Sequence, residues 1–249
     1  MIMTTTAFAE ATINWSTGTV RATGIGMIPQ GNKFYKTQAR QTARGDAVRN
    51  LGELIKGIPI DGDSNIEHLM LVSDVVHSKI NYNFLQYAKQ VGEARFTNDT
   101  CEVTLEWNLF GKESVFSAML PMFENKVKTP FPQPMNKSLK VNAKYTGLIL
   151  DCRGLFLKPV MSPSILNDMG VNIYSYKNLD ANTFVDKGVV TYTTNLKDVA
   201  RAGNNPLIIK AVACSKTSNP IISVADSDKV LIANQATHFL DNASVVIIR

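Results

Sequence analysis

Hydrophobic and polar positions follow two different periods at the start of the chain. Residues 19–27 place small or apolar side chains at every second position, which predicts a short β-strand. Over residues 33–56 the spacing changes to three and four, which predicts a long amphipathic helix with Asn32 as its cap and Gly57 and Pro59 at its end. The apolar stripe of this helix consists of Tyr35, Ala39, Ala43, Ala47, Leu51, Leu54, Ile55 and Ile58. Its alanines indicate close packing on a sheet.

Residues 65–91 fit two interpretations, because their apolar positions match a helix in the first part and a strand at 80–84. The segment that follows predicts a β-hairpin. Residues 91–96 alternate in character, 97–100 form a polar turn, and 102–109 alternate polar with apolar side chains. A strand of this kind buries one face and exposes the other to water.

The second half of the chain shows shorter patterns, in which apolar runs alternate with helical segments. We expect strands at 145–151, 171–174, 188–192, 207–213 and 243–248. Two helices are expected at 195–202 and 225–236, with Asn195 and Ser223 as their caps. Strands that alternate with helices predict a layered sheet-and-helix domain.

Residues 121–142 differ in composition from the segments on both sides, because they combine four prolines with four lysines. We interpret them as a Pro/Lys-rich linker; an ordered crossing loop, or a basic strip that contacts a partner or anionic lipid, is the alternative. The predicted fold class is α+β. An α+β domain with a strand, a long helix and antiparallel strands at 10–120 precedes the linker, and a mixed α/β domain at 143–249 follows it.

Composition and charge narrow the class of protein. Of the 249 residues, 45% are hydrophobic and 19% are charged, which is an ordinary globular balance. The formal net charge of +5 is spread along the chain, so we expect no nucleic-acid binding. No apolar run reaches the roughly 18 residues of a transmembrane helix. The three cysteines and three histidines lack the paired spacing of a zinc site, so we expect no metal and no cofactor.

The beginning of the chain carries a short export signature. Ala7-Phe8-Ala9 before Glu10 matches the small-x-small pattern of a signal-peptidase site. A basic region and a full apolar core are lacking, so we interpret residues 1–9 as the end of a signal peptide; a frayed terminus with two alanines is the alternative. Export would permit one disulfide, although apolar surroundings favour buried free thiols for the three cysteines.

The richest polar cluster follows the predicted strand at 145–151. Asp151 stands at the carboxyl end of this strand, where α/β sheets often bind ligands. Arg153 is suited either to clamp an anion or to pair with Asp151. The candidate binding residues are Asp151, Arg153, Gly154, Lys158, Ser162 and Pro163. No residue is assigned a catalytic role.

Two enzymatic interpretations have weaker support. Cys152 as a nucleophile would need a base, and His238 is a candidate by residue type alone. The simpler interpretation is a turn in which Asp151 and Arg153 fix the chain. Gly24-Ile25-Gly26 lacks the third glycine of a dinucleotide-binding fingerprint, and the helix after it starts too late to receive a pyrophosphate.

Two parts of the chain resemble bacterial envelope families. Ala22-Thr23-Gly24-Ile25-Gly26, followed by the alanine-striped helix with Asp46, Asn50 and Leu51, resembles the LPP20-type envelope domain and the N-terminal domain of flagellar assembly protein T. Residues 103–109 with Gly111 are similar to the closing strand of that domain. Residues 145–155, with Lys158-Pro159 and Ser162-Pro163, are similar to a motif of uncharacterised envelope proteins, where a small residue more usually takes the place of Cys152.

The resemblance implies an exported, non-enzymatic protein of the periplasm or outer membrane with a structural or assembly role. Flagellar assembly protein T belongs to a periplasmic ring around the motor. Envelope proteins, including flagellar basal-body components, are therefore the implied partners, and peripheral membrane association is a further option. The alternative function is a periplasmic module that binds a small ligand or a glycan.

Overall fold

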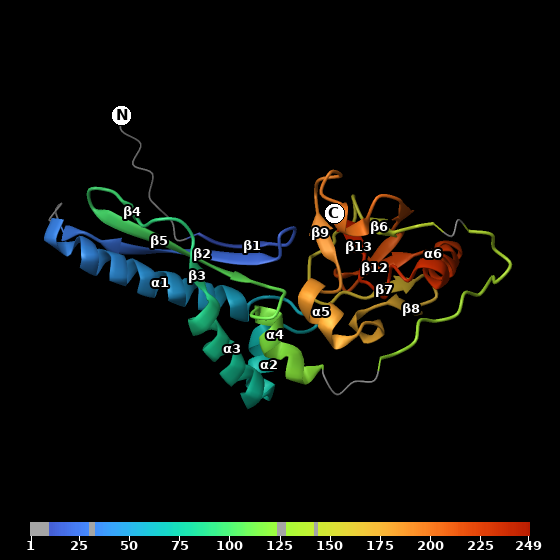
Figure 1. Ribbon diagram of the computed structural model, residues 1–249, viewed down its shortest axis with the longest axis horizontal. Coiled ribbons are helices and arrows are strands. Elements are labelled where there is room, and N and C mark those ends of the chain that lie inside the picture. Colours follow the sequence, from blue (N-terminus) through green and yellow to red (C-terminus); the bar gives the residue numbers. More distant parts are fainter. Residues whose placement is uncertain (1–9, 30–32, 124–127, 142–143) are drawn as a thin grey trace.

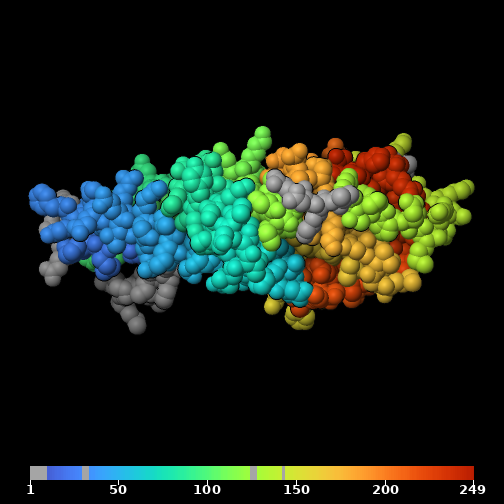
Figure 2. Space-filling view, turned by 90° about the horizontal axis from the view of Figure 1, so that it is seen from below, coloured from blue at the N-terminus to red at the C-terminus, as the bar shows by residue number. Residues whose placement is uncertain are grey.

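The computed structural model describes residues 10–29, 33–123, 128–141 and 144–249. The predicted signal segment at 1–9 and the predicted cap Asn32 lie outside the described residues. Figure 1 shows an elongated molecule with the two halves of the chain at opposite ends, and Figure 2 shows the same order along the long axis. The predicted α+β fold class is confirmed, because a helix-backed antiparallel sheet precedes a region of parallel and mixed sheets with helices.

The N-terminal half is built on a five-stranded sheet with the order β1-β2-β5-β3, and β4 also pairs with β5. Its strands are β1 Ala11–Asn14, β2 Thr19–Met27, β3 Lys89–Gln90, β4 Arg95–Phe96 and β5 Thr100–Asn108. Its helices are α1 Lys36–Lys56, α2 Ile66–Val72, α3 Asp74–Tyr87 and α4 Val115–Met119, with 3-10 turns at Lys33–Tyr35 and Leu120–Met122. Among the described residues, no helix is both long and apolar enough to cross a membrane.

Helix α1 packs on the sheet through the alanine stripe that the sequence predicted. Ala39, Ala43 and Ala47 are buried beneath β2. A β-carbon on Gly24 would lie 2.7 Å from Cα of Ala47, and one on Gly26 would lie 2.8 Å from the carbonyl carbon of Ala39. Glycine is therefore required at both strand positions, since any side chain would push the helix off the sheet.

The other predictions for this half need correction at three places. Of the strand predicted at 91–96, only Arg95–Phe96 forms one, as β4, which pairs with β5. Of the two interpretations of residues 65–91, the helical one holds for α2 and α3, whose buried positions are Ile66, Val76 and Ile80, and the only strand in this range is β3 at Lys89–Gln90. Tyr35 is 43% exposed and does not belong to the buried stripe, because it precedes the first turn of α1. As expected, β5 alternates, with Cys101, Val103, Leu105 and Trp107 buried.

The C-terminal half contains two four-stranded sheets. The first is parallel throughout and has the order β10-β6-β13-β9; the second has the order β11-β12-β7-β8. The strands are β6 Gly147–Asp151, β7 Ile165–Asn167, β8 Asn172–Tyr174, β9 Thr191–Thr193, β10 Pro206–Lys210, β11 Ala213–Ser215, β12 Asn219–Ile222 and β13 Val245–Ile248. The helices are α5 Ala181–Lys187 and α6 Val224–Thr237, with 3-10 turns at Tyr176–Asn178 and Ala200–Ala202.

One predicted helix is wrong. The segment 195–202 contains only the 3-10 turn Ala200–Ala202, because the Asn195 side chain accepts from the N–H of Lys197 and closes a local turn instead of capping a helix. This segment still covers the outer face of the parallel sheet, where Val199 and Ala202 pack with Ile149 and Val246. Ser223, in contrast, caps α6 as predicted, accepting from the N–H of Asp226 at 3.0 Å.

The described part of the Pro/Lys-rich segment lies along the C-terminal half. The N–H groups of Met135 and Asn136 donate to the buried carboxylate of Asp228, at 2.7 and 2.9 Å. Lys128 pairs with Asp241 at 3.1 Å. These contacts fit the alternative of an ordered crossing loop better than a solvated linker.

The two halves meet in an aromatic cluster. The ring centroids of Phe116 in α4 and Phe184 in α5 lie 4.1 Å apart with an edge-on geometry, and Phe123 and Tyr176 join them. Buried residues of both halves form one continuous hydrophobic cluster. The predicted domain boundaries at 120 and 143 stay a prediction.

Candidate functional site

The four strands of the parallel sheet have their carboxyl ends on the same side, and the predicted site residue Asp151 lies there. Asp151 closes β6 and is in register with Lys210 at the end of β10 and with Ile248 near the end of β13. Arg249 follows β13, and its N–H donates to the carbonyl of Thr193 in β9. The carboxyl ends of neighbouring strands therefore present charged side chains together, as is typical of ligand-binding sites in α/β sheets.

Asp151 and Arg153 form a two-point ion pair. Nε and the terminal nitrogen of Arg153 donate to the two carboxylate oxygens of Asp151 at 2.9 and 2.7 Å, and the Arg153 N–H donates to the same carboxylate at 3.1 Å. The hydrogen bond from the Arg153 side chain is the main reason that the pKa of Asp151 falls to about 2, and Lys210 lowers it further. The pair fixes the turn, which supports the structural interpretation of these two residues.

The remaining predicted residues separate into two groups along the loop 152–163. Gly154, with φ of +84°, and Lys158 are exposed, and the N–H of Lys158 donates to the carbonyl of Thr217 at 2.7 Å. Ser162 and Pro163 are buried, and the N–H of Ser162 donates to the carbonyl of Ile60 at 2.7 Å. The structure therefore brings Asp151, Arg153, Gly154 and Lys158 to the surface, buries Pro163, and places Ser162 in contact with the N-terminal half.

Cys152 is not suited to nucleophilic chemistry. Its side chain is buried, at 1% exposure, and burial is the main cause that raises its pKa to about 12. A thiol with this pKa carries almost no thiolate at neutral pH. Cys101, Cys152 and Cys214 are all free thiols. Within the described ranges, no group of three or more His, Cys, Asp or Glu side chains is arranged to hold a metal ion.

Phe156, the most exposed apolar residue of this loop, is not among the site residues predicted from the sequence. Its side chain is 94% exposed, whereas its neighbours Leu155 and Leu157 turn inward. Backbone hydrogen bonds from Cys152 to Ile248, from Leu155 to Cys152 and from Leu157 to Leu155 hold the loop. The signal was present in the sequence, because alternate residues of an extended Leu-Phe-Leu run face opposite sides.

A second candidate surface lies where the two halves meet. Four neighbouring depressions, of about 310, 260, 370 and 820 Å³, are linked by shared lining residues, and we call them together the junction groove. Trp15 and Ser16 join the first to the second, Asn108 and Phe110 join the second to the third, and Lys112 joins the third to the fourth. Neither Asp151 nor Arg153 lines any of these depressions. Interfaces between structural units are common places for binding sites.

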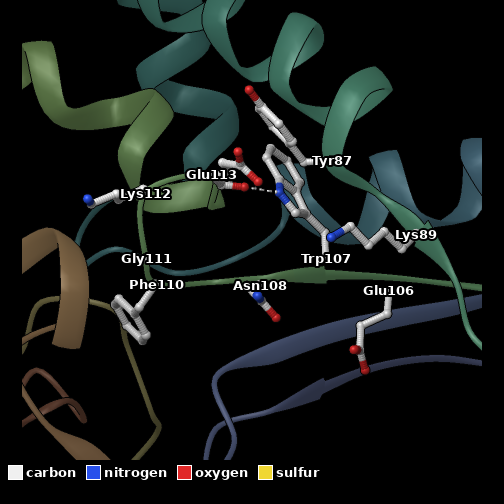
Figure 3. Close-up of a pocket in the computed structure, with 9 residues that line it drawn as sticks. All are labelled: Tyr87, Lys89, Glu106, Trp107, Asn108, Phe110, Gly111, Lys112 and Glu113. Atoms are coloured by element: carbon white, nitrogen blue, oxygen red, sulfur yellow. Dashed lines mark hydrogen bonds between the residues drawn. The ribbon is translucent and has the colours of Figure 1, made fainter.

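Figure 3 shows the third depression, which lies at the end of β5. The indole N–H of Trp107 donates to the carbonyl of Glu113 at 2.7 Å, so this ring is fixed, and it is almost fully buried. Lys89 and Lys112 stand on opposite sides of the depression. Neither lysine forms an ion pair with any residue that the structure describes.

The C-terminal half resembles a known domain family. Residues 147–249 match the family described as Treponema pallidum Tp0624, second domain. The match starts at the first residue of β6, runs through both four-stranded sheets and leaves the N-terminal half outside it. No curated protein matches the chain.

Proposed function

We propose that this chain is an exported, non-enzymatic protein of the bacterial cell envelope with a structural or assembly role, and that it binds a protein partner through the loop 152–158. The envelope setting rests on the resemblance of the β2–α1 segment to LPP20-type domains and on the Ala7-Phe8-Ala9 signature. Flagellar basal-body components are one class of candidate partner. Binding rather than catalysis is favoured by the burial of Cys152.

The observation that carries the proposal is the position of Phe156. A fixed loop displays this ring almost fully to solvent, and the exposed cation Lys158 lies two residues after it, whereas Arg153 before it is paired with Asp151. Aromatic anchors on preorganised loops contribute much of the binding energy at protein interfaces. The partner should therefore offer an apolar pocket with an acidic rim.

The test is recovery of partners from native cells. The chain, with an affinity tag at its C-terminus, is purified from the envelope fraction, and its mature N-terminus and bound proteins are identified. We expect a terminus at Glu10, envelope proteins in the eluate, and their loss in Phe156→Ser. The matched control is Met169→Ser, which removes another apolar side chain that is 64% exposed in the same half. An intact terminus in the cytoplasm, or equal recovery by both variants, would refute the proposal.

A further inference from the structure

We propose that the junction groove binds an extended oligosaccharide of β-linked hexopyranose units. This site goes beyond the protein-binding loop proposed above and lies on different residues. Its evidence is the shape of the groove and the side chains that line it, so the two proposals can fail separately.

The shape of the groove favours a chain-like ligand. Each depression shares side chains with the next. The first, second and fourth are lined by residues of both halves, and the third is lined by the N-terminal half alone. A compact molecule would use one depression and leave the others empty. A β-1,4-linked glycan is an extended ribbon, so successive sugar rings would reach successive depressions, whereas an α-1,4-linked glycan curls into a helix.

The lining offers aromatic surfaces at separate places. Trp15 lies edge-on to Tyr192, with ring centroids 5.8 Å apart, and lines the first two depressions. Phe110 lines the second and the third, and Tyr82, which is 63% exposed, lines the fourth. The C–H face of a pyranose ring packs on an aromatic side chain, which removes apolar area from water on both partners.

Side-chain amides line the same depressions as these rings. Asn83, Asn108 and Asn182 line the groove, and their side chains form no hydrogen bond with any residue that the structure describes. An amide offers both donors and an acceptor, which matches the paired donor and acceptor character of a sugar hydroxyl. In Figure 3, Asn108 lies between Phe110 and Glu106, in reach of a ligand in the depression.

The lining of the groove argues against two other occupants, a nucleic acid and an added β-strand of a partner protein. The lysines Lys89 and Lys112 are interrupted by Glu106 and Glu113, so a nucleic-acid backbone would meet no continuous positive field. A β-strand of a partner protein would find few free backbone groups on β5. Strand β2 pairs with the whole length of β5 on one side, and β3 and β4 pair with its other side up to Glu106. A neutral, hydroxyl-rich chain fits the mixed lining best.

The two tryptophans of the chain provide the readout, because Trp15 and Trp107 both line the groove. The whole chain is titrated with three soluble probes: the hexamer of β-1,4-linked N-acetylglucosamine, cellohexaose, and maltohexaose as the α-linked control. Tryptophan fluorescence and calorimetry follow binding. We expect at least one β-linked hexamer to change the fluorescence and to release heat with a saturable isotherm, and maltohexaose to do neither.

Three variants locate the site. Asn108→Ala and Asn182→Ala should each weaken binding about tenfold, the effect of one lost hydrogen bond. Asn204→Ala removes an exposed amide outside the groove and should leave the affinity unchanged. Phe156→Ser should bind the glycan normally while losing its protein partners, which separates this site from the loop. Absence of binding by both β-linked hexamers, equal binding of maltohexaose, or unchanged affinity in both groove variants would overturn the proposal.

Discussion

The ring of Phe110 lies against the backbone of Gly188, and this contact joins the end of β5 to the end of α5. A β-carbon on Gly188 would lie 2.6 Å from Cζ of Phe110, and Gly188 has a φ of +67°. Gly188→Ala should therefore combine backbone strain with overpacking and lower the free energy of unfolding by about 2–4 kcal/mol. Urea denaturation measures this loss.

Gly92 provides the matched control for Gly188. It has nearly the same backbone conformation, with φ of +68°, but a β-carbon there would meet nothing within 4 Å. Gly92→Ala should therefore show the strain alone, about 1 kcal/mol. Adding Phe110→Leu to Gly188→Ala should restore part of the loss by making room. Equal losses in the two alanine variants would mean that Phe110 does not restrict this site.

Arg201 is half-buried and holds the turn before β9 through its guanidinium group. Its nitrogens donate to the carbonyls of Ala243, Lys187 and Gly188 at 2.6–2.7 Å, and also to Thr191 and Val189. Burial lowers its pKa, although the group remains charged. Arg201→Met should lower the unfolding free energy by about 3 kcal/mol or more, because several buried carbonyls lose their donors.

The control for Arg201 is Arg44→Met, which removes an exposed guanidinium on α1 that forms no ion pair with any described residue. It should change the unfolding midpoint little. Thermal and urea unfolding of the two variants decide the question, and similar small effects in both would contradict the role assigned to Arg201.

The longer elements could be predicted from the sequence because each has its own period. The β2 strand, the α1 stripe and the α6 cap follow from local spacing and from Ser223. The short elements β7, β12 and α5 could not be predicted in this way, because three, four and seven residues carry little periodicity and the strands depend on distant partners. The misplaced helix at 195–202 has a local cause, since Asn195 forms a turn equally well.

The candidate sites were predictable only where the chemistry is local. Asp151 and Arg153 lie two residues apart, and their pairing was one of the two interpretations of the sequence. The burial of Ser162 depends on the Ile60 loop, about a hundred positions earlier in the chain. The junction groove combines Trp15, Asn108 and Asp186, which no local pattern relates. Such a site follows from tertiary packing alone.

Asp228 should control the order of the crossing segment. Its carboxylate accepts the N–H groups of Met135 and Asn136, and Asp228→Asn replaces one of the two acceptors with a donor. We expect faster hydrogen exchange and proteolysis at 133–137 and a loss of about 1–3 kcal/mol. Asp198→Asn makes the same charge change at an exposed site and should alter neither measurement. Unchanged protection in Asp228→Asn would contradict this anchoring.

The Asp151–Arg153 pair should stabilise the fold only above moderately acidic pH. The pKa of Asp151 falls from 3.8 to about 2 in the folded chain, so its stabilising effect is complete above pH 3.8 and is lost as the pH falls toward 2. Arg153→Gln should fold, unfold at a slightly lower temperature at pH 6, and approach the wild type as the pH falls through this range. A difference in midpoint that does not change between pH 6 and pH 2 would assign the loss to the turn backbone instead.

Ala43 tests how closely α1 approaches the sheet. It is fully buried, and its backbone lies beside Gly24 and Gly26, where added β-carbons would clash with the helix. Ala43→Leu therefore has no space to fill and should lower the unfolding free energy by about 1–3 kcal/mol through overpacking, even though leucine is a good helix former. Thr42→Leu, one position along on the exposed face, should change stability by less than about 0.5 kcal/mol. Because both variants add a leucine to the same helix, the difference between their urea midpoints measures the packing of this face alone, and equal midpoints would mean that the helix can move away from β2 without cost.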